Sequence, residues 1–150
     1  MQVEPSDLLS LLRRGTRDAH SRLDARIDFG RHGVTLQRYA AFLDGMLTVV
    51  APLEARLARW LGRSDGTSRT QRLEEDLRSL GAPQAPRSAD VRVPATLAEA
   101  YGCSYVLEGS TLGGMALAPV VERSLGDDVP TTWLRLRGVT IAASVAGRLT

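Results

Sequence analysis

The segment TLAEAYGCSYVLEGSTLGGMALAPVVERSL, residues 96–125, decides the fold that this sequence predicts. Thr96 is a favourable helix N-cap, and Glu99 three residues later is typical of a capping box. Gly126 follows the last residue of the segment, and beyond it the helical pattern weakens. The sequence therefore predicts one long helix from Thr96 to about Leu125.

Three glycines inside this predicted helix lie on one of its faces. Gly102, Gly109 and Gly113 are seven and four residues apart, and Val106 falls between them on the same face. Each glycine inside a helix costs about 0.5–1 kcal/mol relative to alanine, so we expect something to approach the backbone closely here. Close packing of another helix and a cleft for a ligand are both open interpretations of this strip.

Two amphipathic helices are predicted upstream of this segment. The first is expected to begin at Ser6 and to run for about 20 residues to Ile27. Its apolar face is formed by Leu8, Leu12, Thr16, His20, Leu23 and Ile27. Thr35 is the expected N-cap of the second helix, which keeps helical spacing to Trp60 and is expected to bend at Pro52.

The remaining segments predict short helices and loops. A short helix is expected to end at Gly81, and Thr131 or Thr132 is expected to begin a weaker one that continues through Leu136. Glycine, proline and polar residues predict loops at residues 28–34, 62–70 and 82–94. No useful stretch alternates with period two and no repeat is present, so the sequence predicts a single all-α domain over residues 1–150.

The composition is that of a globular protein. The chain has 150 residues, of which 43% are hydrophobic and 24% charged, which excludes a disordered or low-complexity chain. The longest uncharged stretch, residues 109–121, is shorter than the roughly 18 apolar residues of a membrane span, so no membrane segment is expected. Glu4 and Asp7 do not fit a signal peptide, and the single Cys103 permits no internal disulfide, so a cytoplasmic protein is expected. All 19 basic residues are arginines interleaved with acids at a net charge of +2, so nucleic acid is not an expected partner.

Most catalytic constellations are excluded by the residue inventory. His20 and His32 are the only histidines, which excludes a three-histidine zinc site, and no Glu-x-x-His pair is present for a di-iron site. Residues 109–114 lack the lysine of a phosphate-binding loop. His20 on an apolar helical face is open to two interpretations, a hydrogen-bonded core residue or a ligand. A flat ligand bonded to His20 and pressed against the glycine strip would explain both features, and haem has that shape and takes that axial ligand.

Two motifs resemble those of a known family. LRRGTRDAH, residues 12–20, followed by Leu23-Asp24, resembles the proximal-helix motif of haem oxygenases. YVLEGSTLGG, residues 105–114, resembles their distal-helix motif, especially in the bacterial branch associated with bacteriophytochromes. The likeness extends over about residues 8–125 and includes, in family-like order, Tyr39, Phe42, Leu43, Pro52-Leu53-Glu54, Asp76-Leu77 and Leu80-Gly81.

This resemblance implies an enzyme that uses haem as cofactor and substrate and cuts it with O₂ and electrons to biliverdin, carbon monoxide and iron. His20 would be the iron ligand, Asp24 would orient it, and Arg13 would pair with a haem propionate. The same motifs put Thr16 and Gly114 among the cofactor-binding residues. An external electron donor such as a ferredoxin, a reductase or ascorbate would be needed, and a bacteriophytochrome would receive the biliverdin.

On the distal side, the resemblance assigns catalytic roles to Gly109, Ser110 and Gly113. The two glycines would let the helix backbone approach the haem, leaving backbone and water as hydrogen-bond partners. Many members carry an aspartate where this chain has Ser110. The hydroxyls of Ser110 and Thr111 can either hold water or bond to carbonyls of the preceding turn.

Two rival functions and one structural expectation stand beside this interpretation. A haem oxygenase-like protein that binds haem, a bilin or a partner protein without turnover is the first rival. The second is a helical interaction module whose glycine strip packs against a partner helix. Residues 138–150 do not resemble the family's C-terminal helix. The domain is therefore expected to be short at this end, with a more exposed haem edge unless a second copy covers it in a homodimer.

Overall fold

The computed structural model of the protein describes residues 5–62, 68–83 and 90–136. The described residues form helices α1 to α5 and contain no strand, so the all-α prediction is confirmed. The chain divides between Gly33 and Val34 into two compact units. No described helix is long and apolar enough to cross a membrane.

The first unit contains α1, Pro5–Ile27, and the short α2, Phe29–His32. The predicted first helix is confirmed, but it begins at Pro5, one residue before the expected cap, because proline is well tolerated in the first turn. The prediction of a loop throughout residues 28–34 is wrong. Asp28 caps α2, since its side chain accepts a hydrogen bond of 2.9 Å from the Arg31 N–H.

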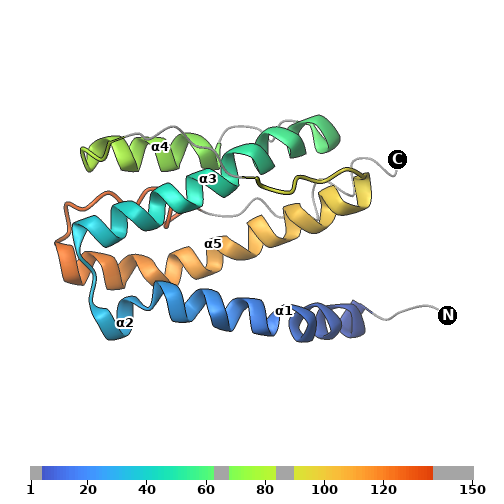
Figure 1. Cartoon of the computed structure of the whole chain (residues 1–150), viewed down its shortest axis with the longest axis horizontal. Coiled ribbons are helices and arrows are strands. Elements are labelled where there is room, and N and C mark those ends of the chain that lie inside the picture. The colour runs from blue at the N-terminus through green and yellow to red at the C-terminus, as the bar shows by residue number, and fades with distance from the viewer. Residues whose placement is uncertain (1–4, 63–67, 84–89, 137–150) are drawn as a thin grey trace. The chain divides into compact units, whose positions relative to one another are not determined.

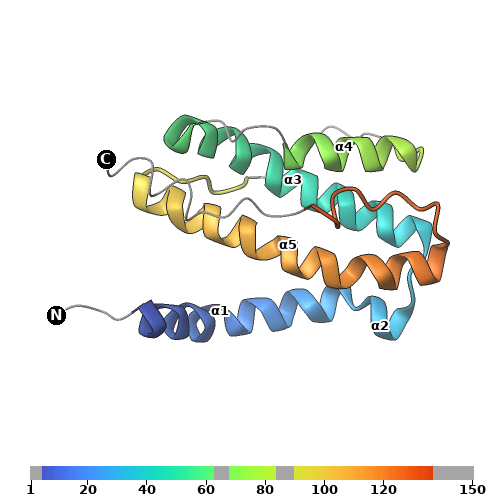
Figure 2. The same cartoon turned by 180° about the vertical axis from the view of Figure 1, so that it is seen from behind.

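The second unit is built around α3, Leu36–Leu61, with α4, Arg69–Ser79, and α5, Leu97–Leu125. Figure 1, and the reverse view in Figure 2, show α3 lying between α4 and α5, and α3 contacts both of them. The three helices bury one apolar face each. Their largest fully buried apolar side chains are those of Tyr39, Leu43, Leu47, Val50, Leu73 and Val121.

The predicted N-caps of the two long helices are confirmed. The Thr35 hydroxyl accepts a hydrogen bond of 3.2 Å from the Arg38 N–H, and the Thr96 hydroxyl accepts one of 3.2 Å from the Glu99 N–H. The Glu99 carboxylate accepts a bond of 2.7 Å from the Ala95 N–H, one residue before the position that a capping box uses. The start of each helix is therefore fixed by local side chains, as the sequence indicated.

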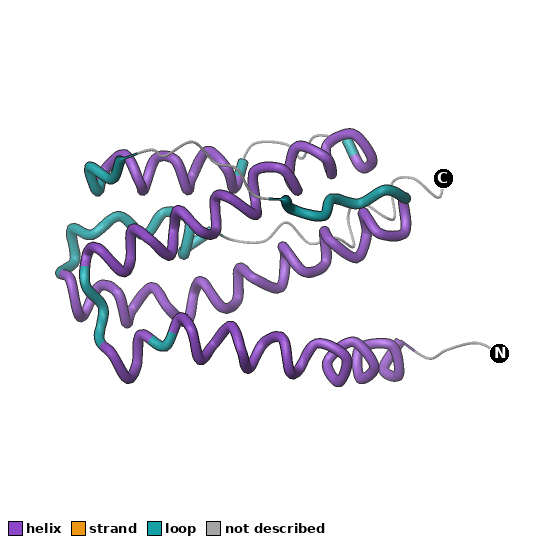
Figure 3. Tube along the Cα trace, viewed as in Figure 1, coloured by secondary structure: helices purple, strands orange, loops and turns teal. Residues whose placement is uncertain are grey.

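The ends of the helices also follow the sequence. Gly81 follows α4 with φ of 64°, and Gly126 follows α5 with φ of 100°, a backbone conformation that glycine adopts without strain. The second helix runs through Pro52 and ends at Leu61, one residue beyond Trp60. Residues 90–96 reach α5 as a loop, as predicted (Figure 3). The loop expected at residues 62–70 ends two residues early, because Ser68 caps α4 by accepting a hydrogen bond of 3.2 Å from the Gln71 N–H and the helix begins at Arg69. Parts of the other predicted loops, 63–67 and 84–89, and the segment 138–150 lie outside the described residues.

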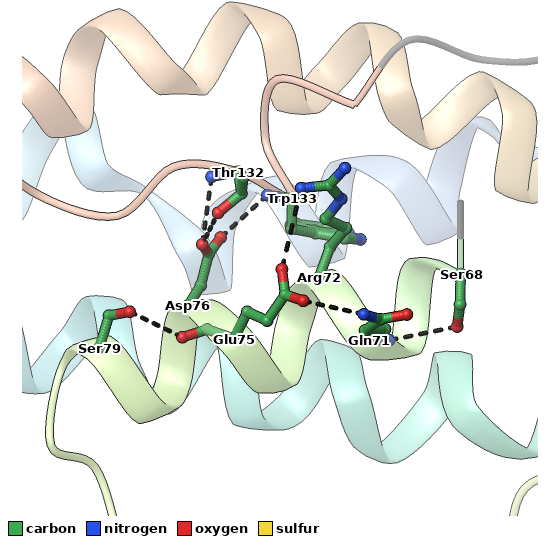
Figure 4. A network of polar contacts seen from close by, with 8 residues as sticks. All are labelled: Ser68, Gln71, Arg72, Glu75, Asp76, Ser79, Thr132 and Trp133. Carbon is green, nitrogen blue, oxygen red and sulfur yellow. Dashed lines mark hydrogen bonds and ion pairs between the residues drawn. The ribbon is translucent and has the colours of Figure 1, made fainter. Parts of the chain in front are cut away.

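The prediction of a helix beginning at Thr131 or Thr132 is wrong. The structure has a single turn over residues 132–135. The cause is Asp76 on α4, whose carboxylate accepts backbone hydrogen bonds from Thr132 (3.2 Å) and Trp133 (2.9 Å) and a further one from the Thr132 hydroxyl (Figure 4). These bonds give the backbone N–H groups a partner outside a helix and tie the segment to α4.

Further contacts fix the same segment to α3. The Tyr39 hydroxyl donates a hydrogen bond of 2.8 Å to the Pro130 carbonyl, and the Trp133 ring packs edge-on against Phe42 at 6.0 Å between centroids. Burial, with the nearby Asp76 and Glu122 carboxylates, raises the pKa of Tyr39 far above its ordinary value, so the phenol remains a neutral donor. We call residues 130–136 the return segment.

Asp76→Ala should lower the free energy of unfolding by about 3 kcal/mol, because the buried Trp133 N–H and its neighbours would lose their acceptor. Asp76 is 1% exposed, so water cannot replace the carboxylate without opening the core. Urea unfolding followed by far-ultraviolet circular dichroism measures the change.

Glu75→Ala is the matched control, because Glu75 is the preceding residue of α4 and its carboxylate accepts a bond of 3.0 Å from the exposed Gln71 amide. Its loss should cost under about 1 kcal/mol. Equal destabilisation by the two substitutions would contradict the role given to Asp76.

Candidate functional site

The residues expected to bind haem on the proximal side all lie on α1. Arg13, Thr16, His20 and Asp24 are three, four and four residues apart, so they share one face of the helix. The side chains of Arg13, His20 and Asp24 are exposed. The Thr16 hydroxyl donates to the Leu12 carbonyl at 2.8 Å, so its donor is already used within the helix.

This face of α1 combines an imidazole with apolar surface. Leu12 is 40% exposed and Leu23 is 51% exposed, although both belong to the stripe that the sequence predicted as apolar. His20 is therefore exposed next to exposed leucines, and the first unit has no apolar core that buries it. An accessible imidazole of this kind can bind a metal.

The predicted glycine strip is open in the second unit. A Cβ built at Gly102, Gly109 or Gly113 meets no heavy atom within 4 Å in the described part of this unit, apart from the backbone of α5 itself. Val106, between them, is 62% exposed. No described helix of this unit packs against the strip, so the interpretation as close helix packing has no support here.

Apolar side chains and a cavity border the strip. Exposed Tyr105, Leu112 and Met115 extend its apolar surface. At its N-terminal end, a cavity of about 380 Å³ is lined by Gly102 and Val106 together with residues that include Leu53, Val93, Pro94 and Leu107. This face can therefore accept a broad apolar ligand close to the backbone of α5.

Gly114 has a different environment from the other glycines of its motif. A Cβ there would lie 2.9 Å from the carbonyl oxygen of Leu134 and 3.3 Å from its Cα. Gly114 is buried, and Leu134 is 0% exposed. The structure thus gives Gly114 a packing role against the return segment, while adjacent Gly113 points about 100° away around the helix. Its expected part in cofactor binding stays a prediction.

The two hydroxyls of the motif bond locally. The Ser110 hydroxyl donates to the Leu107 carbonyl at 2.7 Å, and the Thr111 hydroxyl donates to the Glu108 carbonyl at 2.6 Å. The sequence analysis allowed these hydroxyls either to hold water or to bond to carbonyls of the preceding turn. The structure shows the bonds to the preceding turn. Each hydroxyl oxygen still has lone pairs that can accept a hydrogen bond from water.

The sequence analysis missed an ion pair beside the strip. The Arg69 guanidinium donates a hydrogen bond to the Glu108 carboxylate, and Glu108 directly precedes Gly109. The two side chains are 13% and 20% exposed. Glu108 lies within the distal-like motif, but its partner is 39 residues away, and no local spacing rule connects them.

Each unit, taken by itself, carries residues whose chemistry fits haem. An axial histidine and an apolar surface without side chains are what a flat iron porphyrin needs. The open glycines of α5 leave a surface that three Cβ atoms would otherwise fill, and α1 supplies an accessible imidazole beside exposed leucines.

The comparison with known proteins agrees with this chemistry. A curated protein named "Heme oxygenase" from Xanthomonas campestris pv. campestris (strain 8004) is 30% identical over 130 residues, which cover 73% of this chain and 76% of the relative. No family model matches the chain, and no solved structure matches it. The fold and the two motifs define an all-helical protein with the motif histidine His20 on α1 and an open glycine face on α5. The chain belongs to the haem oxygenase family.

The different environments of Gly113 and Gly114 predict opposite effects of alanine. Gly114→Ala should lower the free energy of unfolding by about 1–3 kcal/mol, because the new methyl group would press on the Leu134 backbone. Gly113→Ala should raise it by about 0.5–1 kcal/mol, because the site is open and alanine favours the helix. Urea unfolding of the two variants beside the unmodified protein measures both changes.

This pair of variants is self-controlled, because the two positions are adjacent and the substitution is identical. A loss of stability at Gly113 as large as that at Gly114 would show that another part of the protein packs on the glycine strip.

Proposed function

We propose that this protein binds haem and cleaves it, with O₂ and electrons from an external donor, to biliverdin, carbon monoxide and iron. The observation that carries the proposal is the open glycine face of α5, at the position where the resemblance puts the haem. Membership of the haem oxygenase family supports it. The bound haem would supply the redox-active iron and the porphyrin that is cut.

On the proximal side, the proposal gives His20 the role of iron ligand. A neutral imidazole binds iron through one ring nitrogen and leaves the other to donate a hydrogen bond. Asp24, one helical turn further on, would accept that bond and fix the ring's orientation. The Arg13 guanidinium would pair with a propionate carboxylate. Thr16, whose hydroxyl donor is bonded to Leu12, would offer packing surface.

On the distal side, the proposal uses the backbone of α5. Gly109 and Gly113 would let the helix lie close to the haem plane, where a side chain would block it. The Ser110 hydroxyl, which donates to Leu107, would act toward a nearby water as an acceptor. The chain would therefore hold water at this site through a hydroxyl and carbonyls, in place of the aspartate that many members carry.

The proposed reaction requires a donor of electrons and a protein that takes up the product. The electrons would come from a ferredoxin, a reductase or ascorbate in the cytoplasm, and a bacteriophytochrome would take the biliverdin as its chromophore. A homodimer in which a second copy covers the haem edge is part of this proposal.

A second candidate is haem or bilin binding without turnover. Ser110 favours it, because its hydroxyl is bonded within α5 and carries no charge that could organise water as an aspartate does. The two candidates differ in one result, the conversion of bound haem.

Haem titration followed by addition of ascorbate or a reductase system tests the function. We expect the Soret band of added haem to shift and sharpen until the protein is saturated, and then to be replaced by a bilin spectrum under reducing, aerobic conditions. A shifted Soret band that never converts would select binding without turnover, and a band that keeps the position of free haem would contradict both candidates.

His20→Ala should abolish the five-coordinate histidine spectrum of the haem complex, because the proposal gives the iron no other axial ligand. His32→Ala is the matched control: His32 is exposed on α2, with Nδ1 3.9 Å from the Asp28 carboxylate. Loss of axial ligation in His32→Ala alone would show that the ligand was assigned to the wrong histidine.

A further inference from the structure

The start of α4 is fixed by a carboxylate from α3. Glu54 accepts hydrogen bonds from the Ser68 hydroxyl (2.7 Å), the Arg69 N–H (2.8 Å) and the Thr70 N–H (3.0 Å). Burial raises the pKa of Glu54, but the hydrogen bonds from Thr70, Ser68 and Arg69 together outweigh it and lower that pKa. The charged form therefore holds the first turn of α4 against α3, with Arg69 at a defined position.

From that position, Arg69 reaches the third helix of the unit. Its Nη2 donates to Oε1 of Glu108 on α5, so Glu54, Arg69 and Glu108 form one polar connection across α3, α4 and α5. The Nε of Arg69 is buried and has no hydrogen-bond partner among the described residues. The contact with Glu108 is therefore made by a single terminal nitrogen of the guanidinium.

A contribution to the stability of the fold does not explain the ion pair between Arg69 and Glu108 well. Burying an ion pair rarely stabilises a fold more than apolar residues of similar volume would, and an unpaired buried Nε adds to the cost. The position of the pair offers another explanation. Glu108 is the residue before Gly109, at the start of a segment in which Gly109, Gly113 and Gly114 all weaken the helix.

We propose that Arg69 is a positioning residue for the haem site: by holding Glu108, it fixes the rotation of α5 and so the direction in which the Gly109 and Gly113 backbone faces the ligand. The inference rests on the proposed function for the identity of that ligand. Adjacent residues of a helix are about 100° apart, so a fixed Glu108 side chain sets where Gly109 points.

The test compares Arg69→Met, which keeps the apolar length of the side chain, with Arg72→Met on the same helix. Arg72 is 39% exposed and pairs with Glu75 at 3.8 Å, so it serves as a control for the loss of one arginine from α4. In the haem-free protein, Arg69→Met should speed hydrogen exchange of residues 105–114 about tenfold, and Arg72→Met should leave that exchange unchanged.

With haem, Arg69→Met should weaken binding about tenfold and shift the Soret and visible bands of the ferric complex, because the glycine face would be misdirected. Arg69→Lys should restore the wild-type spectrum in large part, since one terminal donor is enough to bond Glu108. If Arg69→Met fails to fold, Glu108→Met, which removes both acceptor oxygens and keeps a side chain of similar length, carries the same comparison.

Wild-type exchange of residues 105–114 and a wild-type haem spectrum in Arg69→Met, or in Glu108→Met where that variant replaces it, would overturn the proposal. Altered exchange with an unchanged haem spectrum would also overturn it, because the pair would then only support the helix. A wild-type protein that leaves the Soret band at the position of free haem would overturn the proposed function instead, while the exchange measurement would still report whether the pair orders α5.

Discussion

The second unit depends on the buried carboxylate of Asp76. By accepting the N–H groups of Thr132 and Trp133, it holds the return segment in a turn against α4. This placement brings the Leu134 backbone onto α5 at Gly114, where only a glycine leaves room. One side of α5 is thereby packed through backbone contact, while the side with Gly109 and Gly113 stays open. The same helix can then be rigid and present a bare surface to a ligand.

Features that depend on neighbouring residues were predictable from the sequence. The N-caps Thr35 and Thr96 act on N–H groups three residues away, and the apolar spacing of α3 and α5 gave their extents to within a residue or two. The return segment was not predictable in this way. Its conformation is set by Asp76, which lies 56 residues before Thr132 in the sequence, and no local pattern reports such a partner.

In the candidate site, too, features set by residues close in the sequence were predictable, and features set by distant residues were not. The spacing of the glycines predicted one face, and Gly102, Gly109 and Gly113 do form an open face. Gly114 shares their motif but is directed toward Leu134, because a helix turns adjacent residues apart. The Arg69 and Glu108 pair joins two helices and could only be found in three dimensions. The family is shown by the relative, whereas the roles of His20, Arg13, Thr16, Asp24 and Ser110 are proposals that rest on their motifs.

The central claim is that the open face of α5 exists to receive haem. It is tested most directly by haem titration of Gly113→Leu, with urea unfolding of the haem-free variant alongside. The site is open, so the leucine should leave the free energy of unfolding within about 1 kcal/mol of wild type, while haem binding is lost because the side chain fills the surface. Haem binding at wild-type affinity by a folded Gly113→Leu protein would contradict the claim.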